Sequence, residues 1–104
     1  MTGFSPKLIR YRYIGIIPDT DITVLGPEYP QSFLEEKFKE ECNELTQSGF
    51  SDVSEFADVL EVMLALAQRH GISLHDILDS RVIKLVSKGG FNKGVILNKA
   101  QDDR

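Results

Sequence analysis

The apolar positions of the chain are densest between Ser51 and His70, and their spacing predicts a helix there. Apolar residues also occupy much of the circumference outside the main stripe, at Val59, Val62 and Leu66. A helix that is apolar nearly all round is normally buried, so the pattern predicts a helix at the centre of the fold. The main stripe recurs at helical spacing and consists of Val53, Phe56, Ala57, Leu60, Met63, Leu64 and Ala67.

Acidic residues interrupt this apolar segment at regular intervals. Glu55, Asp58 and Glu61 follow one another in steps of three, which places them along one side of the helix. One interpretation is that this side is solvated, as in many helices of mixed surface. The other is that these carboxylates are buried, which is costly unless they are paired, hydrogen-bonded or bound to a metal.

Two further helices are predicted on either side of the central one. The first begins at Ser32, where Ser32-x-x-Glu35 has the spacing of a capping box, and ends at Ser48-Gly49. Its buried stripe comprises Phe33 or Leu34, Phe38, Cys42 and Leu45. The central helix begins at Ser51 or Asp52 and stops at His70-Gly71, because glycine supplies the left-handed residue that ends a helix.

The third helix begins at Ser73, with Asp76 three residues later, and runs to about Ser87 before Gly89-Gly90. The tail after it is apolar enough to predict that Phe91, Val95, Ile96 and Leu97 make contacts. Before the helices, residues 7–17 favour an extended segment and residues 18–21 favour a turn. These patterns predict an all-α protein with an irregular or extended N-terminal segment.

The length of 104 residues predicts one domain, with an arm at residues 1–30, a helical core at 31–88 and a tail at 89–104. A helical hairpin and a third helix leave part of the central helix uncovered. We expect Val59, Val62 and Leu66 to pair with a second copy, so that dimerisation completes a four-helix-type bundle. A homodimer or a dimer of dimers is therefore predicted.

Charge and composition exclude several classes of protein. Between Glu28 and Glu61 the chain has ten acidic residues and only two bases, whereas basic residues dominate on both sides. This is not the uniform basic field of a protein that binds a nucleic-acid polymer. No apolar run reaches the ~18 residues of a membrane span, and a lone Cys42 suits a reducing compartment, so a cytoplasmic protein is expected.

The short connection between the first two helices requires them to run antiparallel. Glu41 and Glu44, late in the first helix, then face Glu55 and Asp58, early in the second. Four carboxylates that meet in this way repel one another unless a cation lies between them. Oxygen ligands of this kind suit Mg²⁺, with Mn²⁺ as an alternative. The sequence therefore predicts a metal site with these four residues as ligands.

This arrangement resembles the metal signature of the MazG-type all-α nucleoside triphosphate pyrophosphohydrolases, and in particular their phosphoribosyl-ATP pyrophosphohydrolase-like house-cleaning subgroup. The likeness extends over Glu41-x-x-Glu44 with Glu55-x-x-Asp58, Lys7-Leu-Ile-Arg10 near the start, and Gly89-Gly90-Phe91 with Lys93 near the end. The chain differs from that family at Tyr11 and Arg12, where the family tends to have an acid and a lysine.

The resemblance implies a cytoplasmic hydrolase that converts a nucleoside triphosphate, standard or non-standard, to the monophosphate and pyrophosphate. It implies that Lys7, Arg10, Lys88 and Lys93 contact phosphates, and that the protein is an oligomer. We expect Glu41 or Glu44 to act as the general base toward water. Two alternatives are open: an enzyme that acts on phosphoribosyl-ATP, and a catalytically weak oligomer that binds nucleotide as a regulator.

Overall fold

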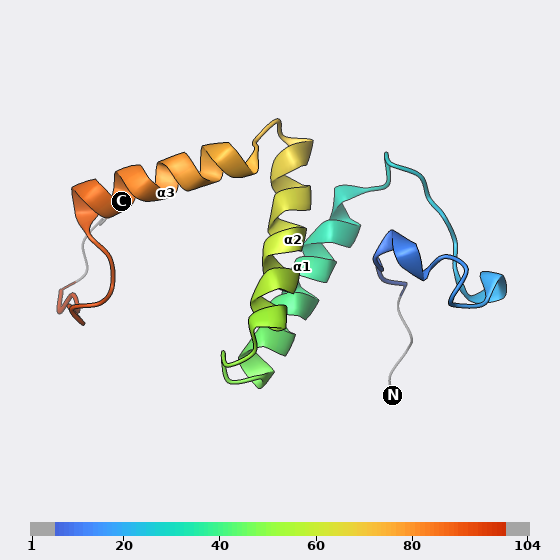
Figure 1. Cartoon of the computed structure of the whole chain (residues 1–104), viewed down its shortest axis with the longest axis horizontal. Coiled ribbons are helices and arrows are strands. Elements are labelled where there is room, and N and C mark those ends of the chain that lie inside the picture. The colour runs from blue at the N-terminus through green and yellow to red at the C-terminus, as the bar shows by residue number, and fades with distance from the viewer. Residues whose placement is uncertain (1–5, 100–104) are drawn as a thin grey trace. The chain divides into compact units, whose positions relative to one another are not determined.

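The structure is a computed structural model that describes residues 6–99, and its regular elements are helices (Figure 1). The α-helices are α1 (Gln31–Gln47), α2 (Val53–Arg69) and α3 (Leu74–Lys88), and two short 3-10 turns, Tyr11–Tyr13 and Asp19–Asp21, precede them. Apart from an isolated bridge between Ile14 and Ile17, residues 6–99 form no strand. The predicted all-α class is confirmed. None of the helices described is both long and apolar enough to span a membrane.

The chain divides into two compact units, Met1–Ile72 and Ser73–Arg104. The first unit contains the N-terminal arm, α1 and α2, and the second contains α3 and the segment after it. The boundary between them lies inside the predicted helical core at residues 31–88. The two 3-10 turns lie in the arm, for which an irregular or extended conformation is expected.

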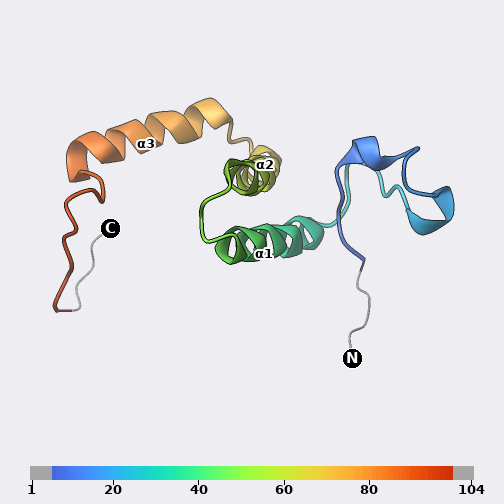
Figure 2. The same cartoon turned by 60° about the horizontal axis from the view of Figure 1, so that its bottom comes forward.

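The first unit is built on an antiparallel hairpin of α1 and α2, which lie side by side in both views (Figures 1 and 2). The helices are joined at residues 48–52, where Gly49 and Phe50 both have a positive φ. At the open end of the hairpin, His70 Nε2 lies 2.9 Å from Gln31 Oε1. The Arg69 guanidinium lies 4.2 Å from the centre of the Tyr29 ring, a cation–π contact that also holds this end together.

The two helices of the hairpin begin in different ways. Asp52 caps α2, because its side chain accepts a hydrogen bond from the backbone N–H of Ser54. The capping box predicted at Ser32 and Glu35 is wrong: α1 begins one residue earlier, after Pro30, and no side chain caps it. Ser32 therefore lies inside the first turn, and the Glu35 carboxylate instead accepts a hydrogen bond from Gln31 Nε2 at 3.0 Å.

The face of α2 that packs on α1 is not the face predicted from the sequence. Val62 is buried, with 8% of its surface exposed, and Val59 and Leu66 are half-buried beside it. Much of the expected main stripe is instead exposed within Met1–Ile72, with Val53 82% exposed, whereas Leu64 and Ala67 are half-buried. Glu55 and Asp58 share the face of Val62, so the contact that buries Val62 also brings these two acids close to Glu41 on α1. Val62, which was expected to need a second copy to cover it, is therefore already buried within the chain.

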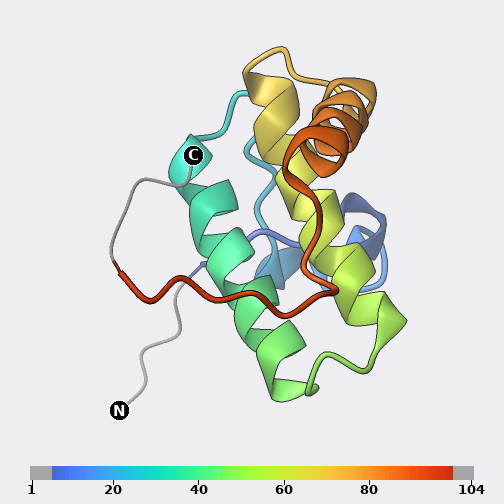
Figure 3. The same ribbon diagram turned by 90° about the vertical axis from the view of Figure 1, so that its left-hand side faces the viewer.

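The second unit contains α3, drawn in orange in Figure 3, and this helix begins with a complete capping box. Ser73 Oγ accepts a hydrogen bond from the backbone N–H of Asp76, and the Asp76 carboxylate accepts one from the backbone N–H of Ser73. The predicted start of α3 is thus confirmed. Gly89, at a φ of 81°, ends the helix as expected. The tail differs from its prediction, because Phe91 is fully exposed (100%) and Val95, Ile96 and Leu97 are also exposed in the chain by itself.

The small core makes the hairpin sensitive to loss of Leu34, which is only 4% exposed. We expect Leu34→Ala to lower the free energy of unfolding by about 2–3 kcal/mol, from lost burial and from the cavity left behind. Val24, at 71% exposed, provides a control, and Val24→Ala is expected to change stability by less than about 0.5 kcal/mol. Chemical denaturation followed by circular dichroism measures both. Equal effects of the two substitutions would contradict this assignment of the core.

Candidate metal centre

Carboxylates from both helices of the hairpin meet at one point. Glu41 of α1 and Glu55 and Asp58 of α2 each offer one oxygen, and these three oxygens lie within 4.8 Å of one another. We call these three residues the carboxylate cluster. The structure thus brings together three of the four predicted metal ligands. The fourth, Glu44, lies exposed one helical turn after Glu41, and Glu61 of α2 is also exposed.

Helical periodicity and the short turn explain this convergence. Glu55 and Asp58 are three residues apart and therefore project from the same side of α2. The turn reverses the chain within a few residues, so the start of α2 lies beside the end of α1. Glu41 is six residues from the last residue of α1, and it meets the first turns of α2 at the same height along the hairpin.

Two oxygens near this point have no hydrogen-bond partner among the described residues. They are Glu41 Oε2 and Glu55 Oε2, and both are buried. The Glu41 side chain is only 9% exposed, so its carboxylate is held away from water. A buried carboxylate oxygen without a partner is costly, and neighbouring carboxylates add repulsion. The cluster therefore fits a divalent cation, since Mg²⁺ and Mn²⁺ accept carboxylate oxygens as ligands.

Basic side chains surround the cluster on the side of the N-terminal arm. Arg10 Nη2 donates to Asp58 Oδ1 at 2.7 Å, which ties the arm to α2. Lys7 Nζ lies 3.3 Å from Glu40 Oε1 and ties the arm to α1. The structure thus brings the predicted phosphate-binding residues Lys7 and Arg10 to the acidic residues, 33 and 48 positions away in sequence.

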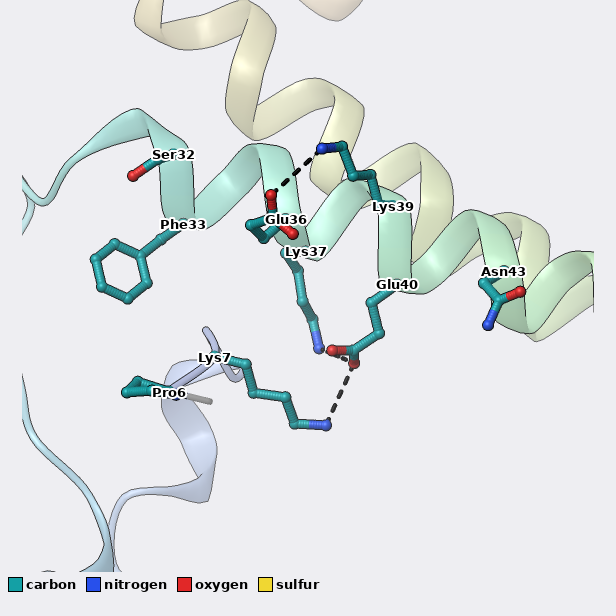
Figure 4. A pocket seen from close by; sticks show the side chains of 9 residues that line it. All are labelled: Pro6, Lys7, Ser32, Phe33, Glu36, Lys37, Lys39, Glu40 and Asn43. Carbon is teal, nitrogen blue, oxygen red and sulfur yellow. Dashed lines mark hydrogen bonds and ion pairs between the residues drawn. The ribbon is translucent and has the colours of Figure 1, made fainter. Parts of the chain in front are cut away.

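Sequence reasoning missed Lys37 and Glu40. Lys37 Nζ lies 3.0 Å from Glu40 Oε1 and 3.2 Å from Glu41 Oε1, and Figure 4 shows Lys7 and Lys37 pointing at the same Glu40 carboxylate. The signal was present, because Lys37 precedes Glu40 by three residues and Glu41 by four, and residues at these spacings are neighbours on a helix. Lys88 and Lys93 belong to the second unit, at the end of α3 and just after it. Their role in phosphate binding stays a prediction.

Two cavities adjoin these charged groups in the first unit. One, of about 380 Å³, lies between the arm and the hairpin and is lined by Lys7, Ile9, Arg10, Tyr13, Lys37, Glu40, Glu41, Glu44 and Asp58. The other, of about 580 Å³, includes Phe33 and Asn43 in its lining (Figure 4). Lys7, Lys37 and Glu40 line both cavities, so the two spaces are neighbours.

The charges shift the pKa values of the acids in opposite directions. Partial burial, followed by the hydrogen bond and charge of Glu41, raises the pKa of Glu44 above its ordinary value. Partial burial, followed by the charges of Asp58 and Asp52, raises the pKa of Glu55. Burial opposes ionisation of Glu40 as well, but hydrogen bonds from Lys37 and Lys7 outweigh it and lower the pKa of Glu40. The site therefore combines acids that hold protons more firmly with one that is held ionised.

Comparisons with protein-family models, with curated proteins and with solved structures found no match to this chain.

The raised pKa values of Glu44 and Glu55 predict how stability depends on pH. Both groups bind protons more tightly in the folded state, so the stability they contribute is present below the ordinary value of 4.5 and is lost as pH rises through the raised values. Without metal, the melting temperature should therefore fall as the pH rises from about 4.5 through the raised pKa values. Mg²⁺ should reduce this fall by compensating the negative charge.

The measurement is a series of melting curves in EDTA and in Mg²⁺. Glu44→Gln removes one of the two groups and should flatten the EDTA series, whereas Glu36→Gln, at an exposed acid outside the cluster, should leave it unchanged. A melting temperature in EDTA that rises across this interval would contradict the prediction.

Proposed function

We propose that the chain is a Mg²⁺-dependent nucleoside triphosphate pyrophosphohydrolase that releases the monophosphate and pyrophosphate. The observation that carries this proposal is a cluster of three carboxylates with buried oxygens that lack partners, Glu41 Oε2 and Glu55 Oε2. A bound cation would stabilise these oxygens, and the basic side chains nearby would bind an anion. A metal–polyphosphate complex satisfies both demands.

The distribution of charge around the cavity supports a polyphosphate. Lys7, Arg10 and Lys37 line the space next to the cluster, and all three are cations at neutral pH. Phosphate oxygens accept charge-assisted hydrogen bonds from such groups. The neighbouring cavity includes the half-buried Phe33, whose ring offers an apolar surface for a nucleobase. We therefore place the phosphates against the arm and the base toward Phe33.

Bound Mg²⁺ supplies neutralisation of the phosphate oxygens and lowers the pKa of a coordinated water. Glu41, Glu55 and Asp58 would hold it, with Glu44 beside them. Glu44 is the better general base of the two candidates, because it is exposed and its pKa is raised by partial burial and by Glu41. It takes the proton of the water that attacks phosphorus. Lys7, Arg10 and Lys37 stabilise the charge on the departing pyrophosphate.

A panel of ribo- and deoxyribonucleoside triphosphates and phosphoribosyl-ATP, assayed with Mg²⁺ and with pyrophosphate as the readout, tests this proposal. Asp58→Asn should lower pyrophosphate release by about 10²-fold or more, since an electrostatic ligand of the metal is lost. Glu35→Gln, at an exposed acid of α1 that lines neither cavity, should retain activity. Circular dichroism should show the same helix content in both variants.

Each outcome of the panel selects one function. Turnover of phosphoribosyl-ATP alone would identify the histidine-biosynthetic type of enzyme instead. Binding of triphosphates without pyrophosphate release would identify a regulatory nucleotide-binding protein. Wild-type activity in Asp58→Asn would show that the cluster is not the metal site.

We also propose that the protein is a homodimer that pairs through the exposed stripe of α2. Val53, Phe56, Leu60, Met63 and Ala67 alternate at spacings of three and four residues, which is the seam of a helix that packs on another helix. Within Met1–Ile72, Val53, Phe56, Leu60 and Met63 are exposed. A seam of this kind matches its own symmetry mate. Two hairpins joined through α2 form a four-helix-type bundle, and two such dimers would form a dimer of dimers.

The proposed seam is tested by Leu60→Glu. A buried charge at the centre of a two-fold seam should shift the protein to monomer, because the same carboxylate is introduced on both sides. Val24→Glu introduces the same charge at an exposed apolar residue of the arm and should leave the dimer intact. Sedimentation velocity measures the species. A wild-type chain that is monomeric at micromolar concentration would contradict the proposal.

A further inference from the structure

The carboxylate cluster is already partly neutralised by cations of the chain itself. Arg10 Nη2 lies 2.7 Å from Asp58 Oδ1, and Lys37 Nζ lies 3.2 Å from Glu41 Oε1. Each basic group contacts one oxygen of its carboxylate and leaves Glu41 Oε2 and Glu55 Oε2 without a partner. The three carboxylates of the cluster are thus paired with only two cations, and one negative charge is left uncompensated.

Lys37 differs from the other ion-paired lysines in how far it is buried. Its side chain is 16% exposed, whereas that of Lys39 on the same helix is 73% exposed. An ammonium that is taken out of water needs anionic partners, and Lys37 has two of them, Glu40 and Glu41. It also lines both cavities. Lys37 thus lies between the cluster and the space in which an anion would bind.

We propose that Arg10 and Lys37 act as exchangeable counter-ions: they pair with the cluster when no metal is present, and they pass to phosphate oxygens when a divalent cation binds. This inference rests on the proposed function, because it concerns the same cluster. It makes the binding of the metal and the binding of the polyphosphate mutually dependent.

The dependence follows from electrostatics. A divalent cation beside Asp58 and Glu41 is repelled by the guanidinium and ammonium groups that already lie there. A polyphosphate alone is repelled by the three carboxylates. When both bind, the metal neutralises the carboxylates while Arg10 and Lys37 gain phosphate partners, so each ligand raises the affinity for the other by the same factor.

If the exchange occurs, removing either basic side chain should change the affinity for the metal and the affinity for triphosphate in different ways. In Arg10→Gln and Lys37→Met the affinity for Mn²⁺ alone should stay the same or rise by several-fold, because a competing cation is gone. The affinity of the Mg²⁺-loaded protein for inorganic triphosphate should fall by about tenfold or more, because a charge-assisted contact is lost. Substitution of an ordinary metal ligand would instead lower the affinity for Mn²⁺ and the affinity for triphosphate together.

Calorimetry with the full chain measures both constants. Mn²⁺ is titrated alone, and the Mg²⁺ complex of inorganic triphosphate is titrated into protein saturated with Mg²⁺. Arg12→Gln is the matched control for Arg10→Gln, since both arginines lie in the arm but Arg12 lines neither cavity. Arg10 is more than half exposed, so its variant is expected to fold and to carry the test even if Lys37→Met does not.

The calorimetric results test the exchange of counter-ions separately from the proposed function. Weaker Mn²⁺ binding in both variants, or triphosphate binding that is unchanged in both, would overturn the exchange while leaving the metal site in place. An equal loss of triphosphate binding in Arg12→Gln would show that the effect is one of general surface charge and would overturn the exchange as well. If the wild-type chain binds no Mn²⁺ at all, the proposed function fails, and the exchange fails with it.

Discussion

The structure of the first unit depends on the antiparallel contact between α1 and α2, which buries like charges against one another. A hairpin of two apolar helices would normally place its largest side chains between them. Here the contact also includes Glu41, Glu55 and Asp58, with Glu41 only 7% exposed. Such an arrangement reduces stability unless each carboxylate has a partner, since unpaired buried charge is unfavourable. The same carboxylates therefore affect both the stability of the hairpin and the chemistry of its site.

The N-terminal arm supplies positive charge that partly compensates the acidic residues of the hairpin. The 3-10 turn at Tyr11–Tyr13 begins directly after Arg10, whose guanidinium reaches Asp58 on α2. Lys7, three residues earlier, reaches Glu40 on α1. The arm thus contacts both helices through ion pairs rather than through an apolar core, and most of its apolar side chains stay exposed. An arm held mainly by charge can change its partners when another anion enters the site.

Much of this arrangement could be predicted from the sequence, and the parts that could not have a common physical cause. Glycines after α1, α2 and α3, and the capping residues Asp52 and Ser73, mark the helix boundaries because their effects are local. The convergence of carboxylates follows from the short turn and the helical period. The orientation of α2 does not follow, because apolar residues cover most of its circumference and several rotations about the helix axis bury similar area. Lys37 was missed for a related reason, since a lysine near glutamates at helical spacing is usually a surface ion pair.

The rotation of α2 connects the site to the exposed surface. Turning Glu55 and Asp58 toward α1 brings Val62 into the core, and the same rotation turns Val53, Phe56 and Leu60 out of it. A helix with two apolar faces can cover only one of them inside a hairpin, and the choice here favours the face that carries the acids. The cost is an uncovered apolar stripe, which an isolated hairpin of this size would find hard to keep in water. Placing the carboxylates inside thus leaves an apolar stripe of α2 exposed within Met1–Ile72, which is the surface that the proposed dimer would cover.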